Sequence, residues 1–76
     1  MKAEKLVRMA NQIALNFEYG ENREKAIAGV VDHLTRFWTP EMRAEIIEHA
    51  AKDASALSDT AAAAVAALAE RRNSAA

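Results

Sequence analysis

The sequence predicts an all-α protein, a small bundle of about four short helices. Proline and glycine are scarce, with one proline and two glycines in 76 residues, whereas alanine is abundant. β-branched residues are few and never alternate with polar residues, as they would in a half-buried strand. Apolar residues instead recur three and four positions apart, which is the spacing of one helix face. We therefore expect a single helical domain over residues 1–72 and a frayed tail over residues 73–76.

The first helix is expected over residues 3–19. Its inner face should consist of the apolar residues at helical spacing, Leu6, Met9, Ala10, Ile13 and Phe17. Gly20 can supply the left-handed residue that ends this helix. Asn22 follows it and suits the N-cap of the next helix, because its side chain can accept a free backbone N–H.

The second helix is expected over residues 23–38. Its apolar residues cover an arc of roughly 140° at 100° per residue, and they are Ala26, Ile27, Val30, Val31, Leu34, Phe37 and Trp38. The two aromatic residues fall near opposite edges of this arc, so both cannot reach the middle of one core. Trp38 continues the line of Ile27, Val31 and Leu34, so we expect Trp38 to point inwards and Phe37 to point outwards.

A tight corner and a third helix, over residues 40–53, should follow. Thr39 can cap this helix, and Pro40 suits its first position because the missing N–H has no partner there. Glu41 complements the positive end of the helix dipole. The expected inner residues are Met42, Ile46, Ile47 and Ala50, and Glu48 and Lys52 should form an exposed ion pair.

The fourth helix should begin at Ser58. Ser58 can act as the N-cap, and Leu57 can contact Ala62 across the cap. The helix is rich in alanine, and Val65 and Leu68 are its large apolar residues. We expect it to form readily, to pack weakly and to be the least stable of the four helices.

Charge and composition exclude several classes of protein. Ten Lys and Arg residues against eleven Asp and Glu give a net charge of −1, without the basic excess of a free-standing nucleic-acid binder. The absence of cysteine excludes disulfides, thiolate metal sites and a cysteine nucleophile. No apolar run approaches the ~20 residues that span a bilayer, and the first residues lack the apolar segment of a signal peptide. We expect a cytoplasmic protein that binds neither membrane nor nucleic acid.

The residues that could carry chemistry do not form a recognisable active site. His33 and His49 are the two histidines, and they lie on different expected helices without a third ligand. Asp32 adjoins His33, but neighbouring helix positions point about 100° apart, so they cannot form a dyad. Asp32 and Arg36 are four residues apart and should form an ordinary surface pair. We therefore assign no catalytic, cofactor-binding or metal-binding residue to this chain.

Two outward-facing groups of residues instead suggest a binding surface. Gly29 sits inside the second helix on its outer face, where it costs about 1 kcal/mol relative to alanine. It shares that side with His33, Arg36 and Phe37, and such a patch would let a partner's backbone approach closely; the alternative is a glycine without a role. On the first helix, Leu15 points away from the core, with Arg8 and Asn11 beside it. A domain this small also benefits from a partner chain, because it has no disulfide.

The segments "LVRMANQIALNF" and "VVDHLTRFWTPEMR" resemble the delta subunit of NAD-dependent, molybdenum-containing formate dehydrogenases. The resemblance covers residues 4–47, and the matching positions are Leu6, Val7, Met9, Ala10, Asn11, Gln12, Ile13, His33, Phe37, Trp38, Pro40, Met42 and Arg43. In this family we expect Asp more often than Thr at position 39 and a basic residue more often than Glu at position 41. Thr39 caps equally well, whereas Glu41 cannot make the salt bridge of a basic residue. The alanine-rich last third matches only as a further helix.

The resemblance implies a non-catalytic accessory subunit that supports assembly, stability or molybdenum-cofactor loading. Its expected partners are the catalytic large (alpha) subunit and the other formate dehydrogenase subunits. These would hold bis-molybdopterin guanine dinucleotide molybdenum, iron–sulfur clusters, FMN and NAD, with no cofactor on this chain. The expected partner-binding residues are those of the two outward groups together with one matching position, namely Arg8, Asn11, Leu15, Gly29, His33, Arg36, Phe37 and Arg43.

Two alternatives belong to other classes of protein. The second and third helices meet at a short turn, as in a helix-turn-helix nucleic-acid-binding protein. The third helix would then present Glu41, Glu45 and Glu48 to the phosphates, which would repel them. The other alternative is a homo-oligomeric helical module unrelated to formate, which the mass of the chain in solution would reveal.

Overall fold

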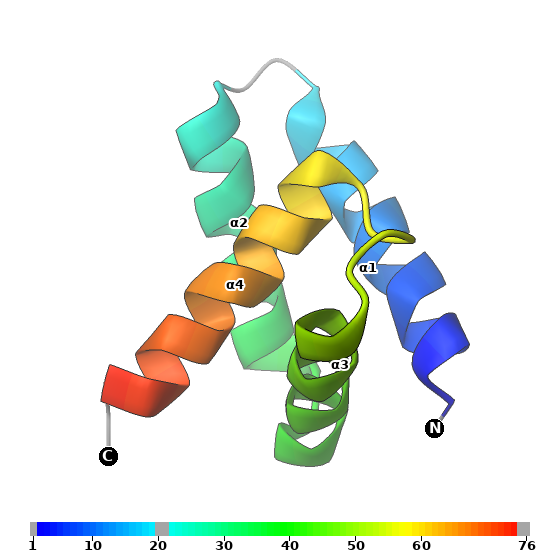
Figure 1. Cartoon of the computed structure of the whole chain (residues 1–76). Helices are drawn as coiled ribbons and strands as arrows, with labels where there is room; N and C mark the ends of the chain where they lie inside the picture. Colours follow the sequence, from blue (N-terminus) through cyan, green and yellow to red (C-terminus); the bar gives the residue numbers. More distant parts are fainter. Residues whose placement is uncertain (1, 20–21, 75–76) are drawn as a thin grey trace.

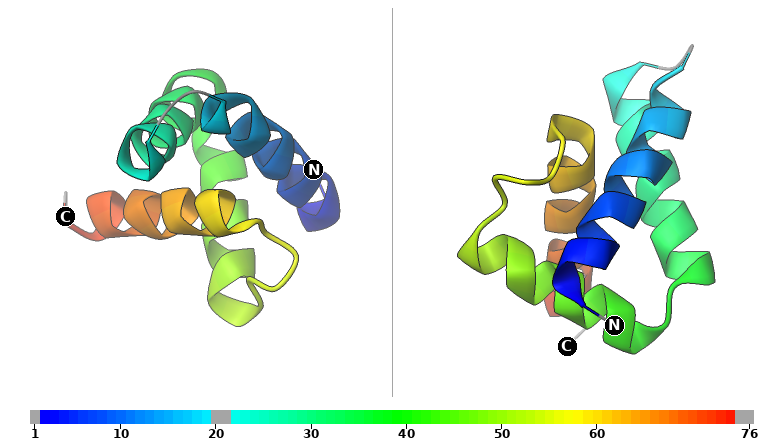
Figure 2. Two further views of the ribbon diagram at one scale, coloured as in Figure 1. Left: turned by 90° about the horizontal axis from the view of Figure 1, so that it is seen from above. Right: turned by 90° about the vertical axis from the view of Figure 1, so that its right-hand side faces the viewer.

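The computed structural model describes residues 2–19 and 22–74. It contains four helices, α1 (Ala3–Glu18), α2 (Arg23–Phe37), α3 (Pro40–Lys52) and α4 (Asp59–Ser74), and no strand in the described part. The expected all-α bundle is confirmed. α1 and α2 run side by side as a hairpin, and α4 crosses them in front while α3 closes the lower end (Figure 1). Figure 2 shows the same crossing from above and from the side.

Three side-chain caps set the beginnings of the last three helices. The Asn22 side chain accepts a hydrogen bond from the backbone N–H of Lys25 at 2.8 Å. The Thr39 hydroxyl accepts one from the N–H of Met42 at 3.2 Å, and the Ser58 hydroxyl accepts one from the N–H of Ala61 at 3.2 Å. All three caps confirm the expectations, because each satisfies a backbone donor that a helix start leaves free. The expected stop at Gly20 lies outside the described residues.

The core is centred on Leu6, Val30, Leu34, Ile46 and Val65, which are all buried almost completely. In α1 the buried face differs from the expected one. Its buried residues are Leu6, Val7, Ala10 and Ala14, whereas Met9, Ile13 and Phe17 are only partly buried. α1 packs against all three other helices. Its two buried alanines let the backbones of those helices approach α1 closely, and its longer side chains lie at the rim of the core.

The expectation that α4 packs weakly is wrong. α4 contacts α1, α2 and α3, and its buried residues are Thr60, Ala61, Ala64, Val65 and Leu68. Small side chains reduce the apolar area of a helix but allow its neighbours to approach closely, so the alanine-rich helix packs against all three others. That α4 is the least stable helix stays a prediction. α4 reaches Ser74, within the span expected as a tail, and residues 75–76 lie outside the described ones.

Asp53 shapes the loop between α3 and α4. Its carboxylate accepts a hydrogen bond from the backbone N–H of Ser55 at 3.0 Å. Hydrogen bonds from the side chain and backbone of Ser55, with a smaller contribution from the charge of His49, lower the pKa of Asp53. At the other end of the loop, Leu57 is buried against the core.

Across residues 2–19 and 22–74, no helix combines the length and the apolar character that a membrane span requires.

Candidate partner-binding site

The corner between α2 and α3 separates its two aromatic residues. Trp38 is 5% exposed and belongs to the core, whereas its neighbour Phe37 is 71% exposed. This confirms the expected inward and outward directions. α2 ends at Phe37, and the N–H of Trp38 still donates to the carbonyl of Leu34 at 3.2 Å. The two side chains therefore leave the backbone at neighbouring positions of a regular helix end, in directions about 100° apart.

His33 joins the exposed ring of Phe37 to α1. The His33 and Phe37 rings lie one turn apart on α2, with centroids 4.7 Å apart and planes tilted by 45°. On its other side, His33 meets the edge of Phe17 from α1, at a centroid distance of 6.3 Å and an interplanar angle of 71°. Such edge and tilted contacts hold aromatic rings in defined positions. Phe37 is thus an exposed ring supported by a row of rings across two helices.

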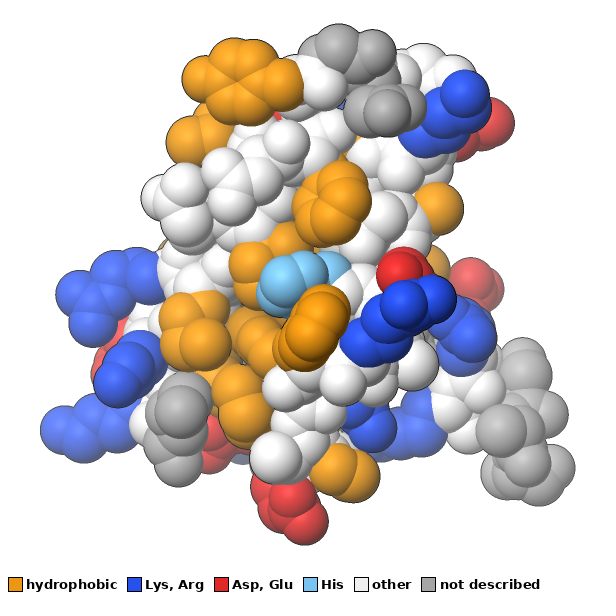
Figure 3. Space-filling view, turned by 180° about the vertical axis from the view of Figure 1, so that it is seen from behind, with side chains coloured by type: hydrophobic (Ala, Val, Ile, Leu, Met, Phe, Trp, Pro, Cys, Tyr) orange, Lys and Arg blue, Asp and Glu red, His pale blue; other side chains and the backbone are white. Residues whose placement is uncertain are grey.

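These rings border an open groove, which we call the corner groove. It encloses about 430 Å³ and is lined by residues of α1, α2, α3 and the corner, namely Met9, Gln12, Ile13, His33, Phe37, Trp38 and Met42. On this face of the molecule, hydrophobic side chains gather around the histidine (Figure 3). This groove is the candidate site of interaction, because large apolar patches on the surface of a protein mark such sites. The two methionines add side chains that adapt to the shape of a partner.

Gly29 has a role inside the chain, which corrects the expected open floor for a partner's backbone. A Cβ atom at this position would lie 2.5 Å from Cδ1 and 2.7 Å from Cε1 of Phe17. The glycine therefore makes room for the Phe17 ring, which covers α2 at this point. Helical periodicity placed Gly29 outside the core stripe, but it could not show that α1 supplies a ring to cover it.

The side chain of Asn11 is hydrogen-bonded to the loop before α4. Its Nδ2 donates to the carbonyl of Ala56 at 2.9 Å, and its Oδ1 accepts from the N–H of Ser58 at 2.8 Å. The amide thus satisfies one acceptor and one donor of the segment between α3 and α4. That Asn11 faces a partner stays a prediction. In the structure the loop between α3 and α4 folds back onto α1, and its backbone binds the Asn11 amide.

Arg43 is likewise turned towards its own chain. Its Nη1 donates to the carbonyls of Leu34 and Thr35 at 3.1 Å each, and also to the carbonyl of Trp38. These carbonyls lie at the end of α2, and the Leu34 carbonyl also accepts the N–H of Trp38. Arg43 therefore acts as a side-chain cap for that helix end. That Arg43 binds a partner stays a prediction. In the structure the corner brings α3 close to those carbonyls, which Arg43 binds.

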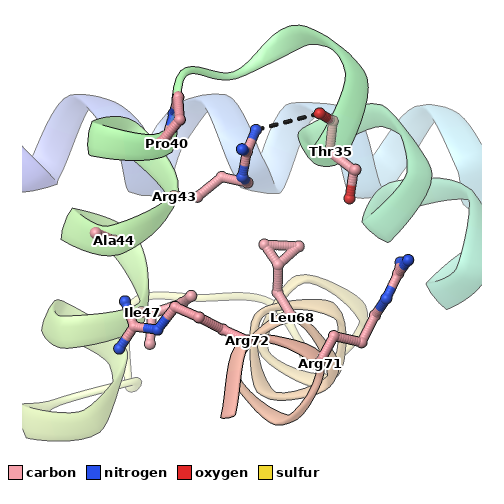
Figure 4. Close-up of a pocket in the computed structure, with 8 residues that line it drawn as sticks. All are labelled: Thr35, Pro40, Arg43, Ala44, Ile47, Leu68, Arg71 and Arg72. Carbon is pink, nitrogen blue, oxygen red and sulfur yellow. Dashed lines mark hydrogen bonds between the residues drawn. The ribbon is translucent and has the colours of Figure 1, made fainter. Parts of the chain in front are cut away.

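Arg43 also lines a second hollow, of about 370 Å³, on a different side of the corner. Arg71 and Arg72 of α4 border it, with Leu68 and Ile47 at its base. The guanidinium groups of Arg71 and Arg72 point to opposite sides of Leu68, while Arg43 turns to the Thr35 carbonyl (Figure 4). The three cations therefore do not converge on a common point.

A third hollow, between α3 and α4, is lined by aliphatic side chains, namely Ile47, Ala50, Ala51, Ala54, Ala62, Val65, Ala66 and Ala69.

The remaining expected partner residues are exposed. Leu15 is 48% exposed, but it does not line the corner groove. Arg8 is exposed one turn before Gln12 of the groove. Arg36 pairs with Asp32 at 3.1 Å, and both side chains are mostly exposed, so the expected surface pair is confirmed. Such a pair adds little stability and leaves Arg36 free to exchange partners.

Of the eight expected residues, His33 and Phe37 line the groove. The sequence reasoning missed the contributions of Met9, Ile13 and Met42, because it assigned them to the core. The sequence did contain an indication of the corner groove, because all seven residues that line it belong to the two segments "LVRMANQI" and "HLTRFWTPEMR". In residues 2–19 and 22–74, no three His, Asp or Glu side chains come together as they would around a metal ion.

The structure is thus an all-α bundle with an open apolar groove. Polar side chains of the same chain cap its helix ends. The family model of the NADH-dependent formate dehydrogenase delta subunit FdsD matches residues 5–65. The chain belongs to this family and is therefore a formate dehydrogenase delta subunit. Comparison with curated proteins and with solved structures gave no match.

Proposed function

We propose that this chain is a non-catalytic accessory subunit that binds the catalytic large (alpha) subunit of a formate dehydrogenase. The observation that carries the proposal is the corner groove, with Phe37 71% exposed beside His33. A large ring held in place by other rings binds a partner without losing much side-chain freedom. The chain would support assembly, stability or loading of the molybdenum cofactor.

The cofactors of the complex would reside on other subunits. Iron–sulfur clusters need thiolate ligands, and this sequence has no cysteine. We propose that the partner subunits hold the bis-molybdopterin guanine dinucleotide molybdenum centre, the iron–sulfur clusters, FMN and the NAD site. The same proposal places the assembled enzyme in the cytoplasm.

Purification through a tag on this chain, from the native host, tests the proposed partner. The large subunit should co-purify in a fixed ratio, and the isolated chain should not reduce NAD with formate. Formate-dependent NAD reduction by the isolated chain would overturn the proposal, as would recovery of the chain alone.

A host that lacks this chain separates the three supporting roles. A role in cofactor loading predicts a large subunit with a lowered molybdenum content. A role in stability predicts a normal metal content and a lower melting temperature of the complex. A role in assembly predicts free large subunit in place of the complete complex. An unchanged complex by all three measurements would contradict an accessory role.

A further inference from the structure

We draw no further inference here: the strongest candidate, the open apolar corner groove between α1, α2 and the start of α3, has charges of both signs around it, and nothing in the described part of the chain shows what covers it.

Discussion

Two sets of residues that the sequence analysis assigned to partner binding have different surroundings in the structure. At the helix junctions, the side chains of Asn11 and Arg43 are hydrogen-bonded to backbone groups of their own chain. At the corner groove, Phe37 remains 71% exposed, supported by His33. The difference has a physical cause. Helix ends and irregular loops leave backbone groups without partners, and nearby amide and guanidinium side chains form hydrogen bonds with these groups. An aromatic ring at the rim has no such partner within the chain.

The largest expected effect separates the two aromatic residues of the corner. Trp38→Ala should lower the free energy of unfolding of the isolated chain by about 3–5 kcal/mol, because it removes a large buried ring. Urea unfolding of the free chain measures this change. A loss below about 1 kcal/mol would mean that the core does not depend on the inward ring.

Asn11→Ala should have the next largest effect, because it removes two hydrogen bonds between α1 and the loop before α4. The expected loss is about 2 kcal/mol, since a donor and an acceptor of the loop backbone lose their partner. Asn16→Ala, at an exposed position of the same helix, is the matched control and should change stability by no more than about 0.5 kcal/mol. Equal losses for the two variants would show that Asn11 does not clamp the loop.

Gly29→Ala tests whether Phe17 is the reason for the glycine. In the unsubstituted background, the new Cβ collides with the Phe17 ring, which offsets the gain of about 1 kcal/mol in helix propensity. In a Phe17→Ala background the collision is absent, so the same change should stabilise the chain. A double-mutant cycle should yield a coupling of about 1 kcal/mol. If the effects of Gly29→Ala and Phe17→Ala are additive, the Phe17 ring is not the reason for a glycine at position 29.

The smallest expected effect on stability belongs to Phe37→Ala. The free chain should keep its stability to within about 0.5 kcal/mol, because the ring is mostly exposed. Association with the other subunits should nevertheless weaken by about thirtyfold, as for an interface anchor. Binding of the variant to the remaining subunits and urea unfolding of the free variant give the two numbers. Unchanged binding together with a large loss of stability would show that Phe37 stabilises its own chain and is not an interface anchor.

Much of the local structure followed from the sequence. The caps at Asn22, Thr39 and Ser58 depend on residues three positions apart, and the opposite directions of Phe37 and Trp38 depend on the 100° step of one helix. The surface pair of Asp32 and Arg36 is local as well. The family resemblance also lies in short segments, so the order of the amino acids alone is enough to show it.

The remaining features were decided by contacts between residues far apart in the chain. Asn11 meets partners 45 and 47 positions away, Gly29 meets Phe17 on another helix, and α4 packs against three helices at once. The periodicity of one helix shows which side is apolar, but not which neighbour covers it or how closely small side chains let that neighbour approach. The sequence by itself therefore determined where the helices lie and which of the two corner rings faces outwards. Only the tertiary structure decided which polar residues serve the chain's own backbone, because that choice depends on which free backbone groups the fold brings within hydrogen-bonding distance.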